Sequence, residues 1–151
     1  MGLFSKKSKN IEAESNINDG LSAEELLKKH KGGELSDTVF LRAFGGKTVY
    51  YSTPFGDCKD GTKKLFVLPA PEGTGYNPVF TSEERLAEFY EKTGRAAYLI
   101  TSAAFAAFLE TARKINDGDT PLKLGAVIDP GHYGVAIDAT ALAAAIDMIK
   151  G

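Results

Sequence analysis

Apolar side chains along this chain recur at two spacings, one typical of amphipathic helices and the other typical of strands. The pattern is strongest at 102–116, where five apolar residues share one helical face, so we expect this helix to pack on a sheet. Spacings of three and four residues predict helices over 22–31, 37–44, 82–93 and 102–116, and a last helix after Asp138.

Segments rich in β-branched and aromatic residues predict strands between these helices. Lys47–Ser52 and Lys64–Leu68 are expected to pair as a hairpin around the turn-rich stretch 54–61. A strand over 76–80 should lie at a sheet edge or a strand end, because Pro78 has no N–H to donate.

Two further regions have strand composition. Ala97–Ile100 is expected to be a buried strand. Asp129–His132 is expected to be the turn of a hairpin formed by 124–128 and 133–137. The chain is therefore predicted to form a mixed α/β (α+β) fold, with a mixed sheet of about five to six strands packed by amphipathic helices.

The helix starts carry recognisable capping signals. Ser22–Glu25 and Thr81–Glu84 each have a hydroxyl residue followed three residues later by glutamate, the pattern of a capping box. Asp138 is expected to cap the last helix.

Length and composition fit one globular domain. Of the residues, 43% are hydrophobic and 25% are charged, which is typical of globular proteins. Residues 1–20 carry charges among Ser and Asn with little apolar surface, so they are expected to form a flexible N-terminal arm. A single domain is expected over 21–151.

Charge and cysteine content narrow the classes of partner. The formal net charge is −2, so the chain lacks the broad positive field that nucleic-acid binding needs. Every apolar stretch is shorter than the roughly 20 residues that cross a bilayer, so we expect no membrane span. Cys58 is the only cysteine, which fits a reducing cytoplasm.

A set of segments in a fixed order resembles a known family. The most specific is Pro78–Phe89, which reads PVFTSEERLAEF. It resembles the signature of the SseB N-terminal domain family, the enhanced-serine-sensitivity proteins of bacteria. Four further blocks match in order: Phe40–Phe44, Thr48–Tyr51, Lys64–Pro69 and Gly125–Gly131.

This resemblance implies a mixed α/β fold in a bacterial protein. It supplies no catalytic residue, because the family name describes a phenotype and not a reaction. Asp129 stands where the family more often has asparagine before Pro-Gly.

The strongest candidates for a site lie around the C-terminal turn. Asp129, His132 and Asp138 would converge in a tight hairpin, and a histidine with two carboxylates can perform acid–base chemistry or hold a metal ion. Each residue also has a structural explanation, because Asp129 fits a turn, Asp138 a helix cap and His132 an exposed loop. Both interpretations stay open at this point.

Tyr133 joins these candidates because aromatic residues at strand edges can anchor a partner. Cys58 has Lys59 beside it but no resolving cysteine, so we interpret it as a surface-loop thiol. We assign no catalytic residue, no cofactor and no metal ligand, and we favour a nonenzymatic protein over an enzyme.

The leading hypothesis is a protein-interaction or regulatory module that binds another protein or a second copy of itself. The alternative is a small-ligand-binding or enzymatic domain with a polar site near Asp129, His132 and Asp138.

Overall fold

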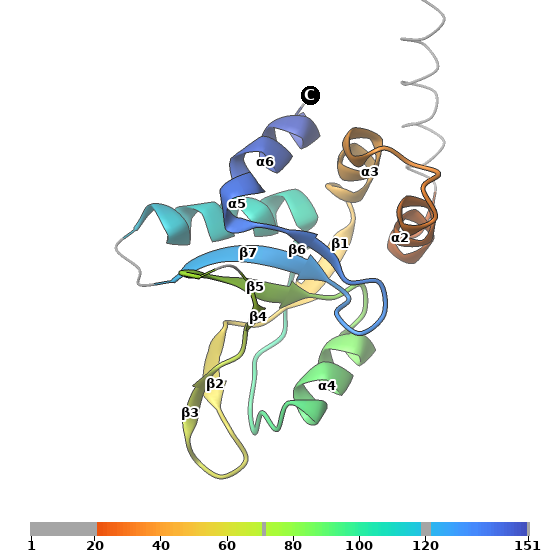
Figure 1. Ribbon diagram of the computed structural model, residues 1–151. Coiled ribbons are helices and arrows are strands. Elements are labelled where there is room, and N and C mark those ends of the chain that lie inside the picture. The colour runs from red at the N-terminus through yellow and green to blue at the C-terminus, as the bar shows by residue number, and fades with distance from the viewer. Residues whose placement is uncertain (1–20, 71, 119–121, 151) are drawn as a thin grey trace, which may run out of the picture.

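The computed structural model describes residues 21–70, 72–118 and 122–150, and it confirms the mixed α/β class (Figure 1). The prediction of a flexible arm over residues 1–20 lies outside the described residues. The helices are α2 (Ala23–Lys31), α3 (Asp37–Phe44), α4 (Glu83–Lys92), α5 (Phe105–Asp117) and α6 (Leu142–Lys150), with the 3-10 turn η1 (Ala139–Ala141) before α6. The strands are β1 (Thr48–Tyr51), β2 (Phe55–Asp57), β3 (Lys63–Leu65), β4 (Leu68–Pro69), β5 (Thr74–Val79), β6 (Thr101–Ala104), β7 (Lys123–Ile128) and β8 (Val135–Ile137).

Within the described residues, the strands form one four-stranded sheet and two shorter ladders. The larger sheet has the order β4-β5-β7-β8, in which β5 and β7 are parallel and the other pairs are antiparallel. β1 pairs with β6, and β2 pairs with β3. A bridge between Tyr50 and Phe80 connects β1 to the residue after β5. The sequence predicted a single sheet, but this one-residue bridge is too short to make the ladders continuous.

The prediction of a hairpin between Lys47–Ser52 and Lys64–Leu68 is wrong. β1 pairs with β6, and the hairpin forms from β2 and β3, partly inside the predicted loop. The glycine in β2 suggested a turn, yet it is needed there because a Cβ at Gly56 would collide with the Arg95 guanidinium. The second predicted hairpin is confirmed, since β7 and β8 are antiparallel neighbours.

Pro78 lies at the penultimate position of β5, which agrees with the predicted strand end. The strand itself is internal, with β4 on one side and β7 on the other. β4 pairs with β5 only at Gly75 and Tyr76, so at Pro78 the strand pairs with β7 alone. The missing N–H of proline therefore interrupts no bond to β4.

The prediction of a buried strand over Ala97–Ile100 is also wrong. The strand β6 begins at Thr101, and Leu99 and Ile100 are 82% and 42% exposed. Apolar composition suits both a buried strand and an exposed edge, so the sequence does not distinguish them. The following helix accordingly begins at Phe105, because the residues from Thr101 onward belong to β6.

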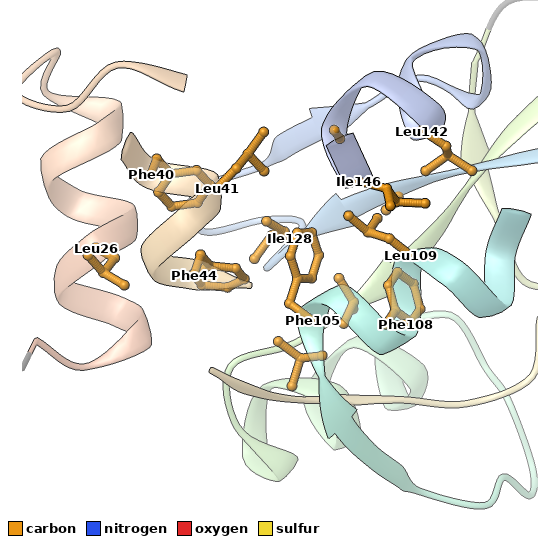
Figure 2. Packing of buried hydrophobic residues seen from close by; sticks show 14 of the residues in the cluster. Leu26, Phe40, Leu41, Phe44, Phe105, Phe108, Leu109, Ile128, Leu142 and Ile146 are labelled. Atoms are coloured by element: carbon orange, nitrogen blue, oxygen red, sulfur yellow. The ribbon is translucent and has the colours of Figure 1, made fainter. Parts of the chain in front are cut away.

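The main core lies between the sheet and the helices α2, α3, α5 and α6 (Figure 2). Phe44 is fully buried in it. Its ring stacks on Phe40 at 5.0 Å and meets Phe105 edge-on at 4.9 Å between centroids. Val79 and Ile128 face this core from β5 and β7. The amphipathic face predicted for α5 is confirmed by its buried residues Phe105, Phe108, Leu109 and Ala112.

A smaller cluster lies under α4, on the other side of the sheet from α5 and α6 (Figure 1). Arg95 packs against this cluster and is 3% exposed, with its guanidinium 4.6 Å from the centroid of the Tyr90 ring and 4.8 Å from that of the Phe66 ring. Arg95 donates hydrogen bonds to the carbonyls of Thr53 and Ala97. This buried cation therefore joins α4 to the chain on both sides of the β2–β3 hairpin.

The predicted capping boxes differ in outcome. At Ser22 the box is confirmed, with Ser22 Oγ accepting from Glu25 N at 3.1 Å and Glu25 Oε1 accepting from Ser22 N at 3.3 Å. The second helix start is shifted by one residue, since Ser82 caps α4 by accepting from Arg85 N at 3.2 Å. Thr81 instead binds Asp129.

The Phe44→Ala variant is expected to lower the free energy of unfolding by about 3–5 kcal/mol, because it leaves a cavity in the main core. Chemical denaturation followed by circular dichroism measures this change. Ile115→Ala is the control, because its side chain is 43% exposed and its loss should cost less than about 1 kcal/mol. Equal losses in the two variants would contradict the core described here.

Candidate functional site

The loop between β7 and β8 is closed by hydrogen bonds to its first residue, Asp129. Its carbonyl accepts from the N–H groups of His132, Tyr133 and Gly134 at 3.0, 3.1 and 3.2 Å. Asp129 has a φ of 48°, and among the described residues no other non-glycine residue has a positive φ. Asp and Asn adopt this left-handed conformation more readily than other side chains, which fits the residue type found here.

The side chain of Asp129 is completely buried and receives donors on both carboxylate oxygens. Oδ1 accepts from Thr81 N at 2.9 Å, and Oδ2 accepts from Thr81 Oγ1 at 2.7 Å. Arg85 Nη1 completes the set with an ion pair to Oδ2 at 2.6 Å. A buried carboxylate without such partners would be costly, so Thr81 and Arg85 are what allows this charge to be buried.

Arg85 extends the network to α2. Its Nη2 lies 2.6 Å from Glu24 Oε1, and the same oxygen accepts from the Tyr133 hydroxyl at 3.0 Å. The Arg85 guanidinium also lies 5.4 Å from the centroid of the Tyr133 ring. These contacts tie α2, α4 and the β7–β8 loop together.

The charges in this network shift one another's pKa. Hydrogen bonds from Arg85 and from the Tyr133 hydroxyl hold the pKa of Glu24 below its ordinary value. Burial tends to lower the pKa of Arg85, but the Asp129 and Glu24 carboxylates outweigh burial and raise it. The Arg85 guanidinium therefore stabilises the charged form of Glu24, and the two carboxyl groups stabilise the charged form of Arg85.

Asp138 lies outside this network, at the end of β8. Its carboxylate accepts a hydrogen bond from the Tyr76 hydroxyl, which raises the pKa of Tyr76. It precedes η1 as expected of a cap, but its side chain makes no capping hydrogen bond there. A Cβ at Gly125 would collide with the carbonyl of Ile137 and with Ala139 N, so glycine is required for this close approach of β8 to β7.

An apolar groove of about 270 Å³ runs beside β8, and we call it the β8 groove. All three residues of β8 line it, so the groove lies between the outermost strand of the four-stranded sheet and the neighbouring helices. Asp37 and Asp138 are exposed at its rim. The remaining lining residues come from α2, α3, η1 and α6: His30, Phe40, Leu41, Ala141, Ala144, Ala145 and Met148.

The four candidates from the sequence are thus divided between two places. Asp129 and Tyr133 are joined through Arg85 and Glu24, whereas Asp138 binds Tyr76 and lines the β8 groove. His132 is exposed on the loop and touches Asp129 through a backbone hydrogen bond. A role of these residues in binding stays a prediction.

His132 also borders a second cavity, of about 340 Å³, between the loop and α4. Arg85, Lys92 and Glu88 supply the charged groups of its lining. Lys92 forms an exposed ion pair with Glu88 at 3.3 Å. This cavity therefore has a mixed-charge lining.

The sequence analysis did not single out Arg85 and Glu24, which connect Asp129 to α2, or Arg95, which packs against the aromatic rings below α4. Arg85 lies within the family-like segment Pro78–Phe89, so the segment itself was the signal that could have found it. The link from Arg85 to Glu24 crosses 61 positions, and no local pattern reports such a contact.

The remaining chemistry-bearing groups are dispersed. No group of three or more His, Cys, Asp and Glu side chains suited to a metal ion occurs in the part of the chain that the structure describes. Cys58 is a half-buried free thiol directly after β2, and its neighbour Lys59 pairs with Glu91 at 2.6 Å. None of the described helices is long and apolar enough to span a membrane.

Comparison with known proteins identifies a family over most of the chain. The family described as the SseB protein N-terminal domain matches residues 23–144, which confirms the resemblance carried by the ordered motifs. No curated protein and no solved structure matches the chain.

Arg85→Gln is expected to lower the free energy of unfolding by about 3 kcal/mol or more, because it leaves the buried Asp129 carboxylate without its cation. Asp129→Asn in the same chain removes that unpaired charge and should recover part of the loss. Urea denaturation of both single variants and the double variant measures the coupling. Additive losses would contradict a direct Arg85–Asp129 pair.

Acidification should weaken the Glu24 contact in a defined pH range. The folded state lowers the pKa of Glu24 from its ordinary value of 4.5. The contribution of Glu24 to stability is therefore complete above pH 4.5 and is lost as the pH falls through the lowered pKa. Thermal unfolding across this range should show the stability difference between the native chain and Glu24→Gln shrinking toward low pH. Glu34→Gln, at an exposed loop position, should show no such convergence.

Proposed function

We propose that this chain, which belongs to the SseB protein N-terminal domain family, is a nonenzymatic protein-interaction module that binds an extended basic segment of a partner protein in the β8 groove. One observation carries the proposal: an apolar groove is lined by β8, the outermost strand of the four-stranded sheet, and by two exposed carboxylates.

The backbone of β8 supports binding by strand addition. β8 is the outermost strand of the four-stranded sheet, and in the described ranges no strand pairs with its other side. A peptide laid along Val135–Ile137 would gain main-chain hydrogen bonds from this edge, the mode by which many domains take up extended segments.

The apolar floor of the groove favours a bound peptide that carries an apolar side chain. Phe40 and Leu41 form part of this floor from α3, and Met148 borders it from α6 with 38% exposure. A cavity of about 150 Å³ can hold benzene, so the β8 groove has room for at least one apolar side chain. Methionine adapts its shape readily, which suits a site for varied peptides.

The charges at the rim favour a basic segment. The Asp37 side chain is 81% exposed and its Oδ1 lies 2.8 Å from His30 Nε2, and Asp138 is exposed after the last residue of β8. Among the described residues that line the groove, none is a lysine or an arginine. Lysine side chains flanking the apolar anchor would therefore meet complementary charge, which also accelerates encounter.

The network at Asp129 supports the proposal by fixing the loop that leads into β8. Lys31 adds a hydrogen bond to the Tyr133 carbonyl at 2.7 Å, next to the start of the strand. A strand edge held in place before binding lowers the ordering cost of association.

The first test is binding of a blocked, fluorescein-labelled peptide of alternating lysine and valine to the full chain, measured by anisotropy. Binding should weaken by about 2- to 10-fold when Asp37→Asn and Asp138→Asn are combined, since each rim pair contributes a modest amount. Both substitutions keep an acceptor for His30 or Tyr76. Asp147→Asn, on α6 but outside the groove lining, is the matched control and should leave binding unchanged.

A second variant makes the test independent of charge. Ala144 is exposed on α6 and lines the groove, so Ala144→Phe should fill it and abolish binding while leaving thermal unfolding unchanged. Equal affinity for a glutamate–valine peptide would contradict the proposal. Stronger peptide binding after Lys6→Glu, Lys7→Glu and Lys9→Glu would show instead that the chain's own N-terminal segment occupies the groove.

A second candidate function is the binding of a small anion beside His132, favoured by the cavity between α4 and the loop. Titration with inorganic phosphate, followed through the His132 ring signals by NMR, tests it. If these signals shift in a saturable way, and the Lys92→Gln variant loses the shifts, anion binding near Asp129 and His132 is favoured over peptide binding in the β8 groove.

A further inference from the structure

A separate cavity of about 230 Å³ lies between the end of β1 and the helix α5, and we call it the β1–α5 cavity. Its lining comes from β1, residues 52–54, β5, β6, α5 and β7, and within the described residues it shares no member with the lining of the β8 groove. Thr101, Thr111 and Ile115 line it and are exposed, so the cavity is reachable from solvent.

Two polar side chains in this lining are buried without a hydrogen-bond partner. Ser52 is 1% exposed and Asn77 is 6% exposed, and both line the β1–α5 cavity. Within the described part of the chain, neither Ser52 Oγ nor Asn77 Oδ1 makes a hydrogen bond. Buried polar atoms are nearly always paired, so two unpaired ones in the lining of a single cavity indicate a partner that occupies it.

The fold turns Asn77 toward α5. Asn77 and Val79 are two residues apart in β5, so their side chains share one face of the strand. Val79 faces the main core, to which α5 contributes Phe108 and Ala112. Both of these α5 residues also line the cavity. The Asn77 amide therefore lies on the side of the sheet where the cavity is.

The apolar walls of the cavity are fixed in place. The Tyr51 ring from β1 meets the Phe108 ring from α5 edge-on at 4.8 Å between centroids. Leu124 is held by Asn116, whose Nδ2 donates to Leu124 O and whose Oδ1 accepts from Leu124 N, both at 2.7 Å. Small-molecule sites are typically formed in advance in this way, with apolar walls and a few polar groups.

The lining selects an uncharged ligand. None of the described residues that line the cavity is charged, so an ionic ligand would lose its hydration without gaining an opposite charge. A cavity of about 150 Å³ holds benzene, so the β1–α5 cavity has room for a ring with a small polar substituent. Asn77 Oδ1 needs a donor, whereas the Ser52 hydroxyl can donate or accept. A carboxamide offers one N–H and one C=O that match these two groups.

We propose that the β1–α5 cavity binds a small uncharged ring that carries a carboxamide. The ligand N–H donates to Asn77 Oδ1, and the ligand carbonyl accepts from the Ser52 hydroxyl. The ring packs against Tyr51 and Phe108. The site is independent of the β8 groove, so the two proposals can fail separately.

Titration of the isotope-labelled full chain with benzamide, followed by NMR, tests the ligand class. Benzamide should give saturable shifts at the amides of residues 51–53, 77 and 111–112. Benzoate, which is charged, and acetophenone, which lacks the N–H, should bind at least about tenfold more weakly. Equal affinity for all three compounds would overturn the proposal. The absence of saturable shifts up to the solubility limit of benzamide would also overturn it, because the cavity would then hold water alone.

Two variants test the position of the ligand. Ser52→Ala should weaken benzamide binding by about 3- to 10-fold and leave thermal unfolding unchanged, because Ser52 Oγ has no partner in the unliganded chain. Ser102→Ala removes an exposed hydroxyl outside the lining and is the matched control for both measurements. Thr111→Phe should fill the cavity and abolish binding, since Thr111 is exposed and its hydroxyl donates only within α5, to the Ala107 carbonyl.

The β8 groove provides the control for location. Ala144→Phe, which fills that groove, should leave benzamide binding unchanged. Benzamide binding that survives both Ser52→Ala and Thr111→Phe, or that is lost in Ala144→Phe, would place the ligand elsewhere and overturn the proposal. A fall in the unfolding temperature of Ser52→Ala with unchanged affinity would show a purely structural role for Ser52 and would likewise overturn it.

Discussion

The arrangement of this domain depends on the ion pair and hydrogen bonds of one buried carboxylate, that of Asp129. A charge that is completely removed from solvent needs full hydrogen bonding and an opposite charge, and Thr81 and Arg85 supply both. Arg85 in turn pairs with Glu24, so a single guanidinium connects α4, α2 and the β7–β8 loop. The left-handed backbone at Asp129 then sets the direction of the loop that leads into β8, whose three residues line the β8 groove.

Local signals predicted most of the elements but not how the strands pair. The helices α2, α3 and α4 follow from apolar spacing with Gly or Ser at their ends, and the β7–β8 hairpin follows from Asp129–Pro130–Gly131 between two apolar runs. β1 was assigned the wrong partner because its true partner, β6, lies about fifty residues away and has a weak alanine-rich pattern. The exposure of Leu99 was missed for a related reason, since burial depends on what lies alongside a strand and not on its composition.

The candidate site was predictable only in part. Asp129, Tyr133 and Asp138 were singled out from the turn, yet Asp129 is explained by Arg85 and Glu24, which no local spacing connects to it. β8 ends the four-stranded sheet, and β6 ends the ladder that the Tyr50–Phe80 bridge joins to β5.

The most direct test of the account is amide hydrogen exchange of the full chain with and without the lysine–valine peptide. Strand addition in the β8 groove predicts slower exchange at Val135–Ile137, with no comparable change at the β2–β3 hairpin. Unchanged exchange along β8 at a peptide concentration that saturates binding would contradict the central claim, because the peptide would then lie elsewhere.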